Sequence, residues 1–197
     1  MGISDIFKSA GLKPVRSIRH NGKRLSQILE AHERFVRGDE TGARADFSGA
    51  DLSNVDFSRR NLAYANFRGA NLAGSSFREA KLASADFSNS RLHKTDLRKA
   101  DLTEANLSGA DLEQAAIAGS ELFRADLSGA ILRRADLGAA NLREARVRGA
   151  DFRGASLKTT ILRETNLEGV DLSGLDLSTT LLPRNYKPSG SPGRAKS

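Results

Sequence analysis

The 197-residue sequence contains no cysteine, which excludes disulfide bonds and thiolate metal ligands. It also lacks any apolar run near the roughly 18 residues that a membrane-spanning helix requires. The first residues show no basic segment followed by an apolar stretch, which is the pattern of a secretory signal. Together these absences favour a cytoplasmic protein.

Catalytic motifs are also missing from the sequence. It has no phosphate loop, dinucleotide fingerprint, nucleophile elbow or HExxH motif. Its three histidines, His20, His32 and His93, are scattered along the chain. We therefore predict that the protein is not an enzyme and that it has no cofactor and no metal site.

The net charge of +7 does not come from the centre of the chain. Residues 1–44 carry nine basic and five acidic side chains, and residues 185–197 carry three basic side chains and no acidic one. The intervening residues hold 19 of each sign. Because basicity is confined to the two ends, we do not expect the body of the protein to bind nucleic acid directly.

The chain between these ends has a period of five residues. From position 47 to position 182, 28 consecutive fifth positions hold Leu, Phe, Ile or Val. Two places before each of these lies a residue that is mostly Ala, Ser, Thr or Val, and directly before it lies Asp or Asn in most repeats. This period matches neither the 3.6 of a helix nor the 2 of a continuous strand. It predicts short extended steps joined by corners, with the large and small residues pointing inward.

Two other features fit this interpretation. All four prolines lie outside residues 45–182, as expected if the backbone N–H groups of the array form hydrogen bonds between coils. The Asp/Asn column occurs in too many repeats to mark a catalytic or metal site. We expect its side chains to accept hydrogen bonds from the backbone at the corners.

The repeats, beginning Ala-Asp-Phe-Ser-Gly at Ala45, resemble those of the pentapeptide-repeat family, A-(D/N)-L-x-x. The resemblance implies an all-β solenoid of bacterial type, a right-handed quadrilateral β-helix with four repeats per coil and about seven coils. It predicts that Phe47, Phe67 and Phe87 stack in one column and that Phe57 and Phe77 stack on the opposite side.

The sequence divides into three parts. Residues 1–44 form a basic N-terminal segment, residues 45–184 the β-helix, and residues 185–197 a disordered basic tail. Within the first part, residues 3–12 could form a short amphipathic helix, and residues 23–37 a longer one. We predict that the apolar face of the longer helix caps the Phe47 end of the array. That face consists of Leu25, Ile28, Leu29, His32, Phe35 and Val36.

Two surfaces depart from the repeat pattern. The first is a candidate partner or dimer surface along one face, which consists of Tyr64, Phe123, Ile161, Leu181 and Leu182, the last three being adjacent near the C-terminal end. The second is a candidate basic face formed by Arg91, Lys94, Arg133, Arg134 and Arg153, with His93, Asp111, Glu113 and Asp151 interleaved. An ordinary solvated face of mixed charge is the alternative for the second surface.

Three functions are compatible with this sequence. The first is a non-catalytic scaffold that presents a rigid rod to a protein partner, with a homodimer through the C-terminal end as one form. The second, implied by the family resemblance, is binding of DNA gyrase by mimicry of DNA, which the neutral body disfavours. The third is peripheral association of the basic N-terminal segment with an anionic membrane.

Overall fold

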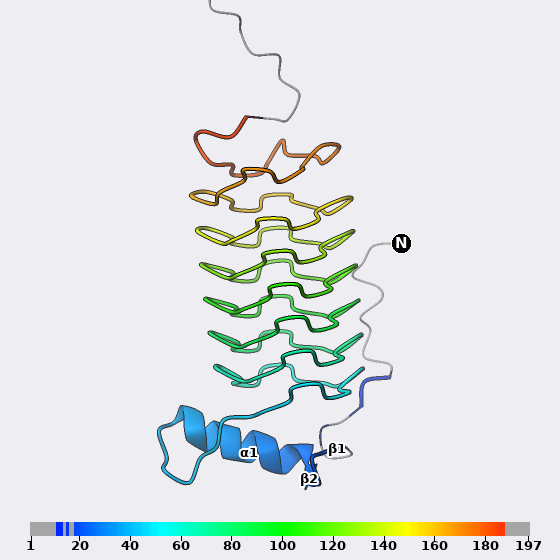
Figure 1. Ribbon diagram of the computed structural model, residues 1–197, viewed down its shortest axis with the longest axis vertical. Coiled ribbons are helices and arrows are strands. Elements are labelled where there is room, and N and C mark those ends of the chain that lie inside the picture. The colour runs from blue at the N-terminus through cyan, green and yellow to red at the C-terminus, as the bar shows by residue number, and fades with distance from the viewer. Residues whose placement is uncertain (1–10, 14, 16–17, 188–197) are drawn as a thin grey trace, which may run out of the picture.

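The computed structural model describes residues 11–13, 15 and 18–187. The short helix predicted over residues 3–12 and most of the tail predicted over residues 185–197 lie outside these residues. The described part is a rod of stacked rectangular coils with one helix beneath its first coil (Figure 1).

The coils stack in a register of 20 residues. Asp46 pairs in parallel with Asn66, Asn66 with Asp86, and the series runs on to the pair Ile161 and Leu181. The Phe47 N–H donates to the Asn66 carbonyl at 2.7 Å, and the Asn66 N–H donates to the Ala45 carbonyl at 3.0 Å. Each coil therefore takes four five-residue repeats, which makes the array a four-sided β-helix.

Each corner is a tight turn whose second central residue has a positive φ. At the first corner the Ala50 N–H donates to the Phe47 carbonyl at 3.1 Å, and Gly49 has a φ of 65°. The same conformation recurs at every fifth position from Gly49 to Gly174. A positive φ at this position is the requirement of a type II turn, and it explains the frequency of glycine there.

The Asp/Asn column supports these corners, as predicted from its frequency. Asp46 Oδ1 accepts a hydrogen bond from the Ser48 N–H at 3.0 Å, and this contact lowers the pKa of the Asp46 carboxyl. Asn66 Oδ1 accepts from the Arg68 N–H in the same way, while its Nδ2 donates to Asp46 Oδ1. The column therefore stabilises turns and cross-links coils.

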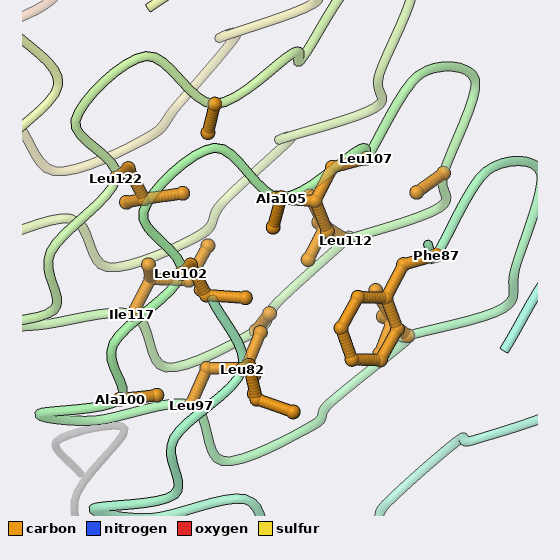
Figure 2. Packing of buried hydrophobic residues seen from close by; sticks show 14 of the residues in the cluster. Leu82, Phe87, Leu97, Ala100, Leu102, Ala105, Leu107, Leu112, Ile117 and Leu122 are labelled. Atoms are coloured by element: carbon orange, nitrogen blue, oxygen red, sulfur yellow. The ribbon is translucent and has the colours of Figure 1, made fainter. Parts of the chain in front are cut away.

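The core consists of the large residues and the small residues two places before them, as predicted. Leu102, Leu107 and Leu112 point into the interior of the coil and are buried (Figure 2). Fully burying a side chain of this size contributes about 1.5–3 kcal/mol before entropy is subtracted. The chain thus builds one continuous core along the axis of the rod.

Two facing aromatic columns fill the first coils, as the 20-residue register predicts. In one column the ring centroids of Phe67 and Phe87 lie 4.7 Å apart, and in the other those of Phe57 and Phe77 lie 4.9 Å apart. Phe67 and Phe77 meet edge to face between the columns at 5.5 Å. Such offset and perpendicular contacts are the favourable arrangements of aromatic rings.

Arg60 is a charged residue at a position that otherwise holds small inward side chains. Its backbone keeps the regular pattern, since the Lys81 N–H donates to the Arg60 carbonyl at 2.9 Å. The guanidinium instead turns outward to Glu33 of the helix, with Nη1 and Oε1 3.8 Å apart. The first coil tolerates this residue because no coil lies below it.

The N-terminal end contains a hairpin that we did not predict from the sequence. Strands β1 (Arg19–His20) and β2 (Lys23–Arg24) pair antiparallel around Asn21 and Gly22, which both have positive φ. An Asn-Gly pair between two strands is a strong hairpin signal. The hairpin brings the His20 ring to 6.1 Å from the Phe47 ring.

Helix α1 (Leu25–Val36) follows directly and is two residues shorter at its start than the segment predicted. Its first turn is held by Gln27 Oε1, which accepts from the Arg24 N–H at 3.0 Å. Gly38, with a φ of 80°, ends it, as expected of a glycine in that position. Within the described residues no helix is both long enough and apolar enough to cross a membrane.

The face of α1 that meets the first coil is narrower than predicted. Leu25, Leu29 and His32 are buried and Ile28 is partly buried, but Phe35 is 37% exposed and Val36 only half-buried. The chain returns over the end of the helix at Gly42, where a Cβ atom would lie only 2.1 Å from the Phe35 backbone nitrogen. This close approach requires glycine.

The last coil is attached less closely than the others. Leu162 N–H donates to the Leu181 carbonyl at 2.8 Å, and Leu181 N–H to the Thr160 carbonyl at 2.8 Å. Among the described residues, however, no parallel bridge joins Asp151 to Asp171 or Ser156 to Asp176, although Arg146 still pairs with Asn166. The regular ladder is therefore interrupted on two of the four sides of the rod, and Figure 1 shows this coil diverging from the one below it.

Candidate interaction surfaces

The apolar edge at the C-terminal end consists of Ile161, Leu181 and Leu182. Ile161 and Leu181 occupy the position that usually holds Asp or Asn, so their side chains face outward on adjacent coils. Leu181 is 41% exposed, whereas Ile161 and Leu182 are half-buried. The structure therefore brings three of the five residues predicted for the partner surface together.

A groove lies at the same end of the rod. Its walls are residues 165–171 on one side and Pro183 with residues 185–187 on the other, and its volume is about 740 Å³. Leu167, Leu175 and Tyr186 are partly buried against the core at this end. Within the described residues no helix covers the last coil, in contrast to the first.

Tyr64 and Phe123 lie on the same side of the rod but do not join the apolar edge. Tyr64 is 53% exposed in the first coil, at the opposite end of the rod. Phe123 is half-buried because the guanidinium groups of Arg124 and Arg143 lie 4.8 and 5.3 Å from its ring centroid. Its ring contributes to packing between coils rather than to a free apolar surface.

Two of the five residues of the candidate basic face pair with acids. Arg153 binds Asp151 through two nitrogens at 2.9 and 2.6 Å, and this pairing lowers the pKa of Asp151 to about 2. Arg133 Nη2 donates to Glu113 at 3.3 Å. Across residues 18–187, only Arg91, Lys94 and Arg134 of this set make no ion pair. The face is therefore mixed rather than a continuous basic patch.

The same face contains three side chains that the sequence analysis placed on it but did not identify as a candidate metal-ligand cluster. One ligand atom each of His93, Asp111 and Glu113 lies within 4.8 Å of the other two, and all three side chains are half-buried. Their spacing along the chain matches no common linear metal-binding motif. The 20-residue register could have found them, since it places His93 directly beside Glu113.

The stacked corners and the continuous core define the chain as a β-helix protein, and sequence comparison identifies the family. The family described as "Pentapeptide repeats (8 copies)" matches residues 120–158 and 148–182, and the one described as "Pentapeptide repeat region" matches residues 41–117. The chain therefore belongs to the pentapeptide-repeat family, whose fold is a right-handed β-helix. No curated protein matches the chain.

The chain is also similar to several solved structures. Rfr23 from the cyanobacterium Cyanothece 51142 is 25% identical, with a TM-score of 0.50 over 56% of this chain and 86% of that one. HetL, described as involved in heterocyst differentiation regulation in Nostoc sp. PCC 7120, is 34% identical, with a TM-score of 0.41 over 72% of this chain and 68% of that one. A trypsin-treated form of QnrB1, a plasmid-mediated fluoroquinolone resistance protein, is 26% identical, with a TM-score of 0.41 over 72% and 78%.

Proposed function

We propose that this pentapeptide-repeat protein is a non-catalytic scaffold that binds a protein partner through its C-terminal apolar edge. The observation that supports the proposal is the difference between the two ends of the rod. At the N-terminal end α1 and the β1–β2 hairpin lie against the first coil, whereas at the other end Leu181 is 41% exposed beside a groove. Exposed apolar surface beside an uncovered solenoid end is typical of an interaction site.

The full fold that we propose has seven coils in residues 45–184, with the helix as a cap. The capping role rests on the burial of Leu25, Leu29 and His32 against the first coil. A solenoid needs such a cap because an open end exposes both apolar side chains and unpaired backbone groups. The opposite end, which no helix covers within residues 18–187, is then left for a partner protein or for a second copy of this chain.

The double variant Ile161→Ser/Leu181→Ser tests this function. Both side chains face outward, so we expect the variant to fold normally and to lose the partner, or the dimer, because the buried apolar area is removed. The matched control is Tyr64→Ser, which removes an exposed apolar side chain on the same side of the rod at its other end. Light scattering with size-exclusion chromatography measures the dimer, and affinity purification from the native host measures the partner.

The two measurements distinguish self-association from binding of a different protein. A dimer that dissociates in the double variant supports self-association, whereas loss of a captured protein with an unchanged monomer supports a separate partner. Retention of every partner and of the oligomeric state by the double variant would contradict the proposal. DNA gyrase is one partner that a supercoiling assay would test, but the 19 basic and 19 acidic residues of the body disfavour mimicry of DNA.

A further inference from the structure

We propose that His93, Asp111 and Glu113 form a binding site for a divalent transition-metal ion. An imidazole nitrogen together with two carboxylate oxygens is a ligand set that suits Zn²⁺ and related ions. Because the three ligand atoms lie within 4.8 Å of one another, a point exists no more than about 2.8 Å from all of them. Side-chain shifts of less than about 1 Å would bring them to the Zn–N and Zn–O distances of about 2.0–2.2 Å.

The backbone of the β-helix places these three side chains together. Asp111 and Glu113 flank the buried Leu112, so both project from the outer side of the same short extended step. His93 lies one coil earlier, and its neighbour Lys94 donates its N–H to the Glu113 carbonyl at 3.0 Å. The ladder therefore holds the ligand positions in a fixed register, which lowers the ordering cost of binding an ion.

Each of the three side chains also has an atom available for a metal. Asp111 Oδ1 accepts from the Glu113 N–H at 3.1 Å, which orients the carboxylate and leaves Oδ2 unused. Glu113 uses only Oε2, which accepts from Arg133 Nη2 at 3.3 Å. In the part of the chain that the structure describes, the imidazole of His93 makes no hydrogen bond or ion pair. Three protein ligands would leave at least one coordination position for water or another small ligand.

Arg133 is the residue that competes with the ion for Glu113. Its Nε lies 3.9 Å from Asp151 Oδ2, and this nitrogen is buried without a hydrogen-bond partner. When a metal ion draws Glu113 toward itself, Arg133 can move toward Asp151 instead of being left as an uncompensated charge. The site is on a different side of the rod from the apolar edge, so it does not depend on the proposed function.

Calorimetric titration of the full chain with Zn²⁺ tests the site, with Co²⁺ absorption as the spectroscopic readout. We expect one ion per chain, and binding at least tenfold weaker in His93→Ala and in Glu113→Gln. Arg133→Gln should bind several-fold more tightly than the wild type because it removes the competitor for Glu113. The matched control is His20→Ala, since His20 is a half-buried histidine outside the cluster, and its affinity should be unchanged.

The variants also separate a specific site from general binding by surface groups. All of them alter groups outside the apolar core, and their thermal unfolding without metal checks that the fold is intact. Failure of the wild type to bind Zn²⁺, or equal binding by His93→Ala and the wild type, would overturn the site. Unchanged affinity in Arg133→Gln would overturn the competition between Arg133 and the ion.

Discussion

At the scale of the residue, many corners hold a side chain in a strained backbone conformation, which the repeat pattern does not reveal. Sixteen residues other than glycine within the array hold a positive φ at the second central position of a turn. Residues with a Cβ atom pay about 1–2 kcal/mol for this conformation. The array tolerates the cost because each corner is fixed by the hydrogen bonds of its coil and its neighbours. Thr159, with a φ of 57°, is the β-branched member of this set.

Replacement of Thr159 by glycine is expected to stabilise the protein. Glycine removes the steric strain of a β-branched residue at positive φ, and the gain should be about 1 kcal/mol after the entropic cost of glycine. The control is Thr103→Gly at the first central position of a corner, where φ is not positive, and it should be destabilising. Urea unfolding measures both changes, and a loss of stability in Thr159→Gly would refute the explanation.

At the scale of the element, the contact between α1 and the first coil depends on a buried histidine. His32 Nδ1 accepts a hydrogen bond from the Ala45 N–H at 3.1 Å, at the point where the array begins. The His32 ring also stacks on Phe35 at 5.8 Å. Burial lowers the pKa of His32, opposed by the backbone of Ala63, while the charge of Arg44 lowers it further and that of Glu33 raises it. The helix therefore prefers a neutral imidazole.

We expect this contact to weaken at acidic pH. The unfolded chain binds a proton on His32 below about pH 6.5, whereas the folded chain binds it only at lower pH. The contribution of His32 to the free energy of unfolding is therefore fully present above about pH 6.5. It decreases as the pH falls toward the folded-state pKa. Urea midpoints at pH 5.5 and 7.5 should show this loss in the wild type.

The variant His32→Asn is the control for that titration. Its amide oxygen can accept from the Ala45 N–H but does not bind a proton in this range. We expect lower stability at pH 7.5 and a smaller difference between the two pH values than in the wild type. An equal pH dependence in both proteins would assign the effect to other groups.

At the scale of the whole molecule, the rod is a chain of nearest-neighbour contacts with unequal ends. Stability in such a solenoid depends on each coil and its interfaces with adjacent coils. The first coils have facing phenylalanine columns and a helix below them, whereas the last coil lacks the backbone ladder on two of its four sides among the described residues. We infer that local opening begins at the C-terminal end, where the proposed partner surface lies.

Hydrogen exchange would measure this difference. The amides of Phe152 and Leu157 should exchange faster than those of Leu112 and Ile117, which occupy equivalent positions two coils earlier. The earlier set donates to carbonyls of the next coil at 2.7–2.8 Å, and no such bond is formed by the later set. Equal protection of the two sets would contradict the loosened coil. Slower exchange of the later set on adding a partner would locate binding at this end.

Much of the fold follows from the sequence because its interactions repeat at a fixed distance along the chain. The five-residue period identifies the inward positions, and the 20-residue register then predicts the columns of Phe67 and Phe77. The Asp/Asn column and the corners are equally local, since each side chain such as Asp46 supports the turn that follows it. Helix α1 and its end at Gly38 also follow from helical spacing and from the conformational freedom of glycine.

The candidate sites depend instead on contacts that no local pattern encodes. Phe123 is covered by Arg143 from the next coil, Phe35 is left exposed where Gly42 crosses the helix, and Arg60 turns outward because no coil lies below it. The hairpin at Asn21 was signalled by its Asn-Gly pair. The meeting of His93 with Glu113 required the register of the coils as well as the sequence.

The sequence by itself therefore determined the core, because one large side chain recurs at every fifth position, and the resemblance of its repeats to the pentapeptide-repeat family implied the β-helix. Only the tertiary structure decided which outward residues meet across coils and how the two ends differ. Those features depend on side-chain direction and on neighbours 20 residues away. At the ends, the regular neighbour on one side is missing, so the repeat pattern no longer specifies the contacts.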